Sequence, residues 1–384
     1  MSIVSKVFGM GKNKTLSIVQ YYRKLPKRYK RFLYPYANQT SKKMSIDIKK
    51  IVKKALFSLI YYSGLLHLYL VLMFKKRKHF PAVIINYHRF VKSTDGVIDN
   101  EPTVTHCIDD FKKEMCFIKR YFDLVSLDKI VETLKTGRKF KKPTVAVTID
   151  DGYKDNFELL FPILKEFDIP VTIFLTTSLI GTNKGIWVDR LAEIILNTKQ
   201  EVFNANGLFK EQKFTLTSLK QKRYAYRSIL GKLKDLNISD RDRYLTQIEE
   251  QLGMQHNEKR VMLNWSEIRI MQQNNIHFGA HTCTHPILTN MPLEDAKKEI
   301  FESKRIIEEK LGLAVKHFAY PNGRPKDFNE ELRQFCKEVG FESISTCDFG
   351  NNERTDDVWA LRRIGSYVPI SVFAVYFVRS FLYR

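Results

Sequence analysis

Cysteine is scarce in this 384-residue sequence, and its spacing argues against several classes of protein. There are five cysteines, an odd number, and no Cys-x-x-Cys pair, so we expect neither a disulfide framework nor a cysteine-rich zinc module. This pattern favours reduced thiols in a cytoplasm. The first 15 residues also lack the hydrophobic core and the small-residue cleavage site of a secretory signal, so we expect no cleaved signal peptide.

Acidic residues are almost absent from the first 80 positions. This stretch holds 19 lysines and arginines against one acidic residue, Asp47, so it carries +18 of the chain's net charge of +22. Such charge suits anionic lipid headgroups or nucleic acid. No zinc-finger spacing or recognition-helix motif accompanies it, so we expect no nucleic acid partner. Residues 1–54 are therefore interpreted as a basic arm for a membrane surface.

The next segment, ALFSLIYYSGLLHLYLVLMF at 55–74, is apolar and has no formal charge over twenty residues. That length just spans a bilayer, but serine, glycine and histidine dilute its hydrophobicity. Three interpretations stay open: a helix lying in the membrane interface, a transmembrane helix, or a buried helix of a soluble domain. Lysines flank both ends, so they set no orientation. We expect residues 55–80 to associate with a membrane, at the cytoplasmic face of the inner membrane.

Buried-strand patterns alternate with helix patterns from residue 81 onward, and this predicts an α/β domain over 81–384 with a parallel sheet or barrel. The polar stretch at about 197–262 breaks the alternation and is interpreted as a helical insertion. The expected strands are 81–90, 144–149, 169–177, 276–282, 315–321 and 341–347, and the expected helices include 109–122, 293–312 and 326–340.

Two pairs of adjacent aspartates follow isoleucine. Asp109-Asp110 opens a predicted helix, where carboxylates offset the positive end of the helix dipole, so its expected role is structural. Asp150-Asp151 follows the predicted strand 144–149 at its C-terminal end, where α/β barrels carry their active sites. The second pair is therefore the candidate for chemistry.

His281 and His285 lie four residues apart just after another predicted strand, and Pro286 favours a strand-to-loop turn there. Two histidines and one carboxylate form a common zinc set that leaves positions open for water and substrate. Hydrolysis also needs a base, and adjacent aspartates that point in different directions can divide the two roles. The carboxylate and histidine motifs are both expected at C-terminal strand ends, so we expect them to converge on a metal.

These motifs resemble those of the polysaccharide deacetylase family, also called carbohydrate esterase family 4. Thr148-Ile149-Asp150-Asp151-Gly152 is similar to its first signature, and His281-Thr282-Cys283-Thr284-His285 to its second; FAYPNG at 318–323 is similar to the third. The likeness extends over about residues 81–365, through NYHRF and IWVDRL. It implies a deformed (β/α) barrel.

The resemblance implies a role for each matched residue. Asp150 is expected to act as the general base, while Asp151, His281 and His285 are expected to bind a divalent metal, usually zinc. The backbone N–H of Tyr320 is expected to help bind the oxyanion. The implied reaction removes an acetyl group, by preference an N-acetyl group, from a sugar of a surface polysaccharide or a lipid-linked glycan.

The sequence departs from the family pattern at two places. Ala319 stands where many members carry an arginine that holds the catalytic aspartate, and Arg362 or Arg363 is the candidate replacement. No histidine follows His317, so the late histidine that serves as general acid in many members is missing. His317 is a candidate acid, and His88 is interpreted as a hydrogen-bonded wall residue, with an active-site role as the alternative. Alternative functions are an O-acetyl esterase or deformylase on the same substrates, an inactive glycan-binding domain, or a membrane scaffold acting through the basic arm.

Overall fold

A computed structural model of the chain describes residues 48–93, 105–208, 212–253, 260–353, 356–366 and 369–381. The chain divides into two compact units, residues Met1–Ile60 and Tyr61–Arg384. In the first unit the described structure is helix α4 (Ile48–Tyr62), which ends just inside the second. Most of the predicted basic arm, residues 1–47, lies outside the described residues. All further elements belong to the second unit.

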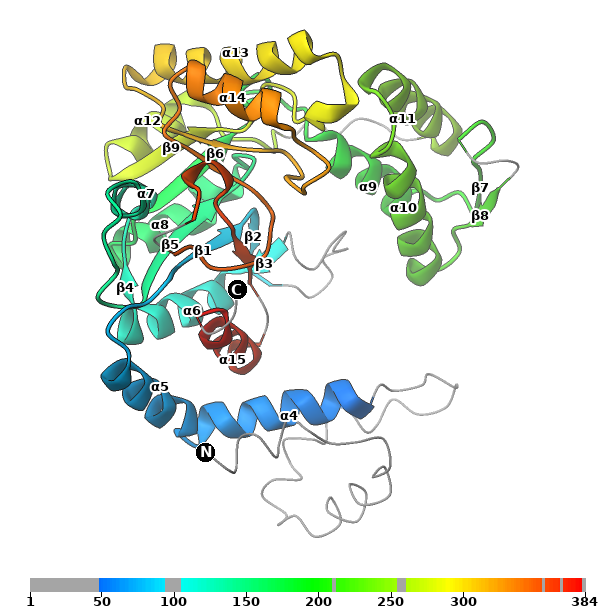
Figure 1. Cartoon of the computed structure of the whole chain (residues 1–384). Helices are drawn as coiled ribbons and strands as arrows, with labels where there is room; N and C mark the ends of the chain where they lie inside the picture. The colour runs from blue at the N-terminus through cyan, green and yellow to red at the C-terminus, as the bar shows by residue number, and fades with distance from the viewer. Residues whose placement is uncertain are drawn as a thin grey trace. The chain divides into compact units, whose positions relative to one another are not determined.

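A curled parallel sheet of eight strands forms the centre of the second unit (Figure 1). Its strands follow the order β11 (Ser343–Ser345), β10 (His317–Ala319), β9 (Ile276–Ala280), β6 (Val171–Leu175), β5 (Thr144–Ile149), β1 (Ala82–Tyr87) and β12 (Ile364–Gly365), with β4 (Asp123–Leu124) beside β5. A parallel bridge joins Ser345 to Leu361, just before β12. The α/β class and the barrel-like sheet are therefore confirmed.

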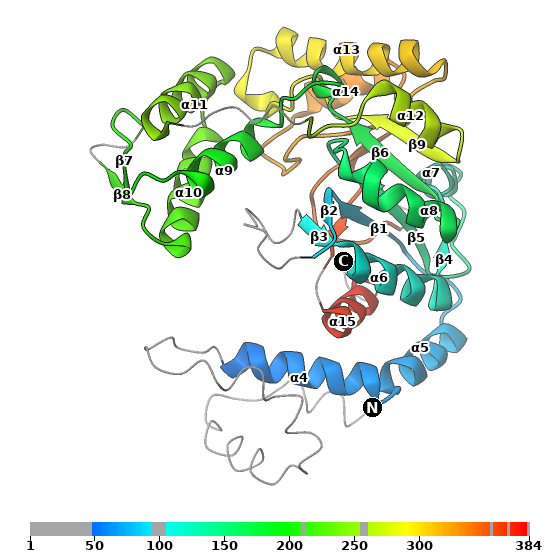
Figure 2. The ribbon, with the colours of Figure 1, turned by 180° about the vertical axis from the view of Figure 1, so that it is seen from behind.

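The central strands are buried on both faces, as parallel sheets between helices require. Every residue of β1, β5 and β6 is buried. Helices lie around the outside of the sheet (Figures 1 and 2): α6 (Ile108–Tyr121), α7 (Leu127–Lys135), α8 (Phe161–Glu166), α12 (Trp265–Gln272), α13 (Leu293–Leu311) and α14 (Glu330–Glu338). Asp109 and Asp110 lie in the first turn of α6, as predicted.

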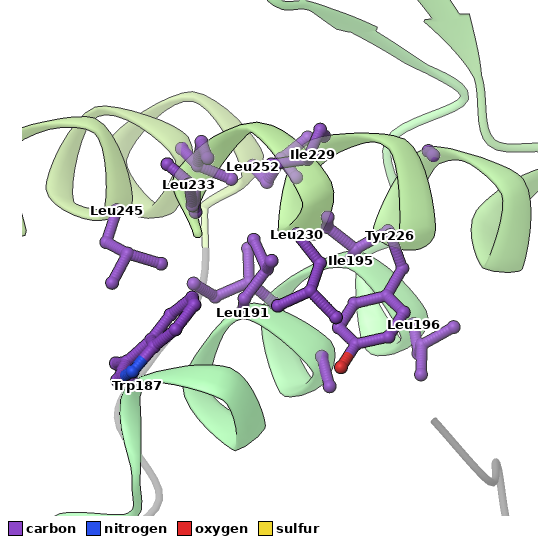
Figure 3. Close-up of a cluster of buried hydrophobic side chains, with 14 of the residues drawn as sticks. Trp187, Leu191, Ile195, Leu196, Tyr226, Ile229, Leu230, Leu233, Leu245 and Leu252 are labelled. Atoms are coloured by element: carbon purple, nitrogen blue, oxygen red, sulfur yellow. The ribbon is translucent and has the colours of Figure 1, made fainter. Parts of the chain in front are cut away.

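The predicted insertion is helical and has an apolar core of its own. It consists of α9 (Trp187–Asn197), a hairpin of β7 (Val202–Asn204) and β8 (Lys213–Thr215), α10 (Leu219–Leu233) and α11 (Ile238–Leu252). Side chains of its three helices, among them Leu191, Leu230 and Leu245, face one another (Figure 3). A capping box at Ser218 starts α10. Helix α9, which precedes the predicted range of about 197–262, contributes side chains to the same apolar cluster.

Two apolar helices lie near the ends of the second unit, α5 (Leu65–Lys76) and α15 (Ile370–Ser380). Within the described ranges no single helix is long and apolar enough to cross a membrane. Helices α4 and α5 together have the required length and composition, but the chain bends between them, where Gly64 adopts a φ of 80°. Phenylalanines of α15 pack against α6, so this helix belongs to the core.

Short elements complete the fold. Strands β2 (Arg89–Val91) and β3 (Thr105–Cys107) form a separate parallel pair. A π-helical turn η2 (Asn156–Leu160) precedes α8, and the 3-10 turns are η3 (Thr177–Leu179), η4 (Leu288–Asn290) and η5 (Val358–Ala360). Strands β10 and β11 are shorter than the predicted ranges 315–321 and 341–347.

Candidate active site

The predicted metal ligands converge at the C-terminal edge of the sheet. Asp150 and Asp151 directly follow β5, and His281 directly follows β9. Ligand atoms of Asp151, His281 and His285 all lie within 4.8 Å of one another. The Nε2 atoms of both histidines are 3.3 Å from Asp151 Oδ1. Three side chains from two loops therefore form the cluster that the motifs predict.

A left-handed turn after β5 separates the two adjacent aspartates. Asp151 has a φ of 80° and Gly152 a φ of 82°, conformations that L side chains rarely adopt. A Cβ atom on Gly152 would also lie 2.8 Å from Leu175 Cδ2. The turn points Asp151 toward the histidines, whereas Asp150 points toward Arg363. The Asp-Asp-Gly sequence is thus what allows neighbouring carboxylates to serve two purposes.

The histidine loop is held in a similarly uncommon conformation. Thr282 and His285 have φ values of 65° and 59°. The Glu299 carboxylate from α13 accepts hydrogen bonds from the backbone N–H groups of Cys283 (2.7 Å) and Thr284 (2.9 Å). Such backbone strain persists only where surrounding contacts enforce it. Glu299, which sequence reasoning missed, therefore supports the loop that presents both imidazoles.

The donor atoms of the cluster suit a divalent metal. His281 Nδ1 lies 2.7 Å from the carbonyl oxygen of Ala319, an arrangement that places the proton on Nδ1 and leaves Nε2 free to act as a ligand. Burial raises the pKa of Asp151, but the approach of His281 and His285 outweighs it and holds this pKa well below its ordinary value. Among the described residues, Asp151 Oδ1 has no hydrogen-bond partner. A cation would compensate this buried charge.

Asp150 is held by an arginine, and the structure identifies which one. Arg363 makes a bidentate pair with Asp150, with Nη1 2.7 Å from Oδ1 and Nη2 2.9 Å from Oδ2. Asn86 Nδ2 donates a further hydrogen bond to Oδ2 at 2.9 Å. Arg362 instead points to Asp356, 3.6 Å away. Ala319 replaces the arginine of the family pattern, and Arg363, directly before β12, contacts Asp150 instead.

The bidentate pair keeps Asp150 ionised although it is buried. Burial raises the pKa of Asp150, and the positive charge of Arg363 is the largest of the opposing influences, so the pKa is lowered. Arg363 is itself buried, and its Nη1 also donates to Asn86 Oδ1 at 2.9 Å. A charge-assisted pair of this kind fixes the orientation of the carboxylate as well as its charge.

Of the two histidines His88 and His317, the structure places only His88 beside Asp150. His88 Nε2 lies 3.8 Å from Asp150 Oδ2, and its side chain is 25% exposed. His317 lies at the opposite edge of the sheet, at the start of β10, where its Nδ1 is 2.8 Å from Ser343 Oγ and its Nε2 is 3.4 Å from Asp128. His317 is therefore not a residue of this site.

Tyr320 is adjacent to the cluster, but its expected role finds no support in the geometry. Its backbone N–H donates to the carbonyl of Ser345 at 3.2 Å, which extends the pairing of β10 with β11. Its ring is buried and stacks on Phe328, with centroids 4.6 Å apart. Binding of an oxyanion by this N–H stays a prediction.

A second group of polar side chains, beside the cluster of Asp151, His281 and His285, was not predicted from the sequence. Arg89 Nε lies 3.2 Å from Asp155 Oδ2, and its guanidinium is 4.6 Å from the ring centroid of Tyr153. Tyr153 donates its hydroxyl to Asp189. Burial is the largest cause that raises the pKa of Asp155, to about 6. Arg89 lies in NYHRF and Asp189 in IWVDRL, two segments that resemble the family. The resemblance implied no role for either residue.

The geometry defines the chain as a barrel-like α/β protein with a hydrolase-type polar site, and comparison supplies the family. A model of the polysaccharide deacetylase family matches residues 137–344, more than half of the chain. The matched range includes both aspartates, both histidines and Tyr320. The chain therefore belongs to the polysaccharide deacetylase family.

Individual relatives are distant. YxkH of Bacillus subtilis is 20% identical over 58% of this chain, and the match spans about half, 53%, of the length of YxkH. The poly-beta-1,6-N-acetyl-D-glucosamine N-deacetylase of Staphylococcus epidermidis is 25% identical over 52% of this chain and 71% of its own length.

Solved structures confirm the fold. The Streptococcus pyogenes deacetylase PplD, in complex with acetate, aligns with a TM-score of 0.52 at 16% identity, over 79% of this chain and 99% of that one. IcaB from Ammonifex degensii aligns with a TM-score of 0.50 at 16% identity, over 77% of this chain and 98% of that one. At this identity the likeness concerns the fold alone.

Proposed function

We propose that the chain is a metal-dependent deacetylase that hydrolyses an N-acetyl group on an amino sugar of a surface polysaccharide or a lipid-linked glycan. The observation that carries the proposal is the ionised Asp150, which forms a bidentate pair with Arg363 beside the cluster of Asp151, His281 and His285. Family membership supports a carbohydrate substrate, and the Staphylococcus epidermidis relative, named for N-deacetylation, favours the amide bond.

The residues of the site divide the work of amide hydrolysis. Asp151, His281 and His285 would hold the metal, which supplies Lewis acidity; their donor set suits zinc. Asp150 accepts a proton from the attacking water, and Arg363 keeps the carboxylate ionised for that purpose. His88 lies within 3.8 Å of Asp150 and donates a proton to the leaving amine. Water and the N-acetyl sugar are thereby converted into acetate and a free amino sugar.

The test is a product analysis with the full-length protein. Oligomers of N-acetylglucosamine are incubated with zinc, and acetate and free amine are measured together. We expect equal amounts of both, abolished by a chelator and by Asp150→Asn. Asp110→Asn, in the structural aspartate pair, is the matched control and should keep full activity.

The same measurement separates the alternatives. Acetate without free amine from an O-acetylated glycan identifies an esterase, and formate from a formylated substrate identifies a deformylase. Zinc binding without product from any acylated glycan would favour a glycan-binding domain. A membrane scaffold predicts that Asp150→Asn leaves the biological effect of the protein intact.

A further inference from the structure

Helix α5 presents two apolar faces, and the described part of the chain covers only one of them. The inner face is buried through Leu66, Leu70 and Met73, which recur at helical spacing. The outer face carries three leucines that remain about half exposed: Leu65 at 55%, Leu68 at 54% and Leu72 at 50%. Tyr62, just before the bend, is 74% exposed. An ordinary surface helix would carry polar residues there.

Contacts to the catalytic domain fix which way the outer face points. His67 Nδ1 lies 3.1 Å from the hydroxyl of Tyr121, and Arg77 Nη1 donates to the carbonyl of Phe381 at 3.0 Å. The Phe74 ring packs edge-on against Phe122 and Phe80, with centroids 5.9 Å and 5.6 Å apart. Both ribbon views place α5 below β4 (Figures 1 and 2). The helix is thus anchored to the domain, with its leucines turned outward.

A dense patch of positive charge continues from the end of α5. Residues 75–79 and 138–142 contain eight lysines and arginines and no acidic residue. The two segments lie side by side, because Phe80 N–H donates to the Phe140 carbonyl at 3.1 Å in an antiparallel bridge. All eight cationic side chains are exposed. We call them the basic patch: Lys75, Lys76, Arg77, Lys78, Arg138, Lys139, Lys141 and Lys142.

We infer that the outer face of α5 and the basic patch together dock onto an anionic lipid bilayer. An exposed apolar face beside clustered lysines and arginines is the combination that interfacial helices use. The 12 residues of α5 extend about 18 Å, short of the roughly 30 Å hydrocarbon core, so the helix lies in the membrane surface. A second copy of this chain fits less well, because a two-fold contact would oppose two basic patches.

The anchor and the candidate active site lie at opposite edges of the sheet. Phe80 lies two residues before β1 and Phe122 directly precedes β4, so these side chains, which contact α5, mark the edge where strands start. Asp150 and His281 mark the edge where strands end. A six-residue strand such as β5 separates these edges by about 20 Å. In the docked domain, the edge that carries Asp150 and His281 is therefore clear of the anchor. The docking goes beyond the proposed function and does not depend on it.

Vesicle sedimentation of the full-length protein tests the inference without any activity assay. Vesicles of phosphatidylcholine are compared with vesicles that also contain phosphatidylglycerol, at low and high salt. Salt screens the basic patch and the basic arm but not the insertion of leucines. We expect wild type to bind anionic vesicles at both salt concentrations. The triple variant Leu65→Ser, Leu68→Ser, Leu72→Ser should lose about tenfold or more of the binding that survives high salt.

A matched control uses exposed apolar residues elsewhere on the domain. The triple variant Leu219→Ser, Ile270→Ser, Phe301→Ser changes side chains that are 43–46% exposed, and it should bind like wild type. The variant Lys75→Gln, Lys76→Gln, Lys78→Gln should weaken only the binding at low salt. Unchanged thermal unfolding midpoints confirm that both serine variants fold.

Three results would overturn the inference. The first is binding at high salt that the α5 variant leaves unchanged, and the second is the absence of high-salt binding from wild type. The third is a wild-type dimer, seen by light scattering without vesicles, that the α5 variant converts to a monomer while vesicle binding stays the same. That third result would assign the outer face to another copy of the chain.

Discussion

The tripeptide Ile-Asp-Asp occurs at 108–110 and again at 149–151, and the two copies have different surroundings. The first begins α6, where Asp109 is exposed and Asp110 pairs with Lys113 at 3.0 Å. The second follows β5, where both carboxylates are buried and each faces its own partners. Composition is therefore a poor guide to chemistry, whereas position at a strand's C-terminal end in a parallel sheet is a good one.

The largest expected contrast between the two pairs is in activity. Asp150→Asn removes the proton acceptor and should reduce kcat by about 10²–10⁴-fold, the range for a lost general base. Asp110→Asn should leave kcat unchanged. Zinc binding by Asp150→Asn, measured by calorimetry, should persist because the three metal-type ligands remain. Comparable losses in both variants would mean that neither pair is catalytic.

Arg363 provides a second contrast, seen in the pH dependence. Its charge is the largest influence that lowers the pKa of Asp150, so Arg363→Met should raise this pKa. Because the base must be deprotonated, the acidic limb of kcat/KM should then move to higher pH, and activity should fall most at acidic pH. Arg363→Lys should shift the limb less, since lysine keeps the charge but not the bidentate geometry.

Arg362→Met is the matched control for that experiment. Arg362 pairs with Asp356 rather than with Asp150, so its removal should leave the acidic limb in place. An acidic limb that moves equally in both variants would show that the arginines act through the general field of the protein and not through the pair with Asp150.

Gly152, in the left-handed turn that follows Asp150, should matter for the stability of the fold. Gly152→Ala places a Cβ atom 2.8 Å from Leu175 Cδ2 at a φ of 82°, so we expect a loss of about 1–3 kcal/mol in the free energy of unfolding. Gly231→Ala, in the last turns of α10 with nothing within 4 Å, should instead stabilise by up to about 1 kcal/mol. Urea denaturation measures both, and equal effects would contradict the strained turn.

The smallest effect is expected from the first pair. Asp109→Asn weakens a favourable interaction with the α6 dipole, so it should cost about 0.3–1 kcal/mol of unfolding free energy at low salt and less at high salt. Urea denaturation at two salt concentrations checks this. A loss that does not depend on salt would point to a role other than the dipole.

Much of this site could be predicted because its signals are local. The apolar run 144–149 became β5 residue for residue, and the motifs at its end and after β9 placed Asp151, His281 and His285 together. In contrast, the sequence could not show which of the adjacent residues Arg362 and Arg363 contacts Asp150. Successive side chains of an extended chain point to opposite faces, so the choice depends on a strand register that the sequence does not state.

Other features depend on contacts between distant segments. Arg89 meets Asp155, and Glu299 reaches the loop of Cys283, only because separate loops converge in three dimensions. Leu65 and Leu66 are adjacent leucines with the same hydropathy, yet Leu65 is exposed and Leu66 is buried. The alternatives for residues 55–74 therefore could not be separated by hydropathy. The described structure shows α5 packed on the domain by one face only.

The central claim is that Asp151, His281 and His285 hold a divalent metal beside an ionised Asp150, and calorimetric titration of zinc into the full-length protein tests it most directly. We expect one tight site in wild type, its loss in the His281→Ala, His285→Ala double variant, and its retention in Asp150→Asn. A folded wild-type protein without a zinc site, or a site that survives the double variant, would contradict it.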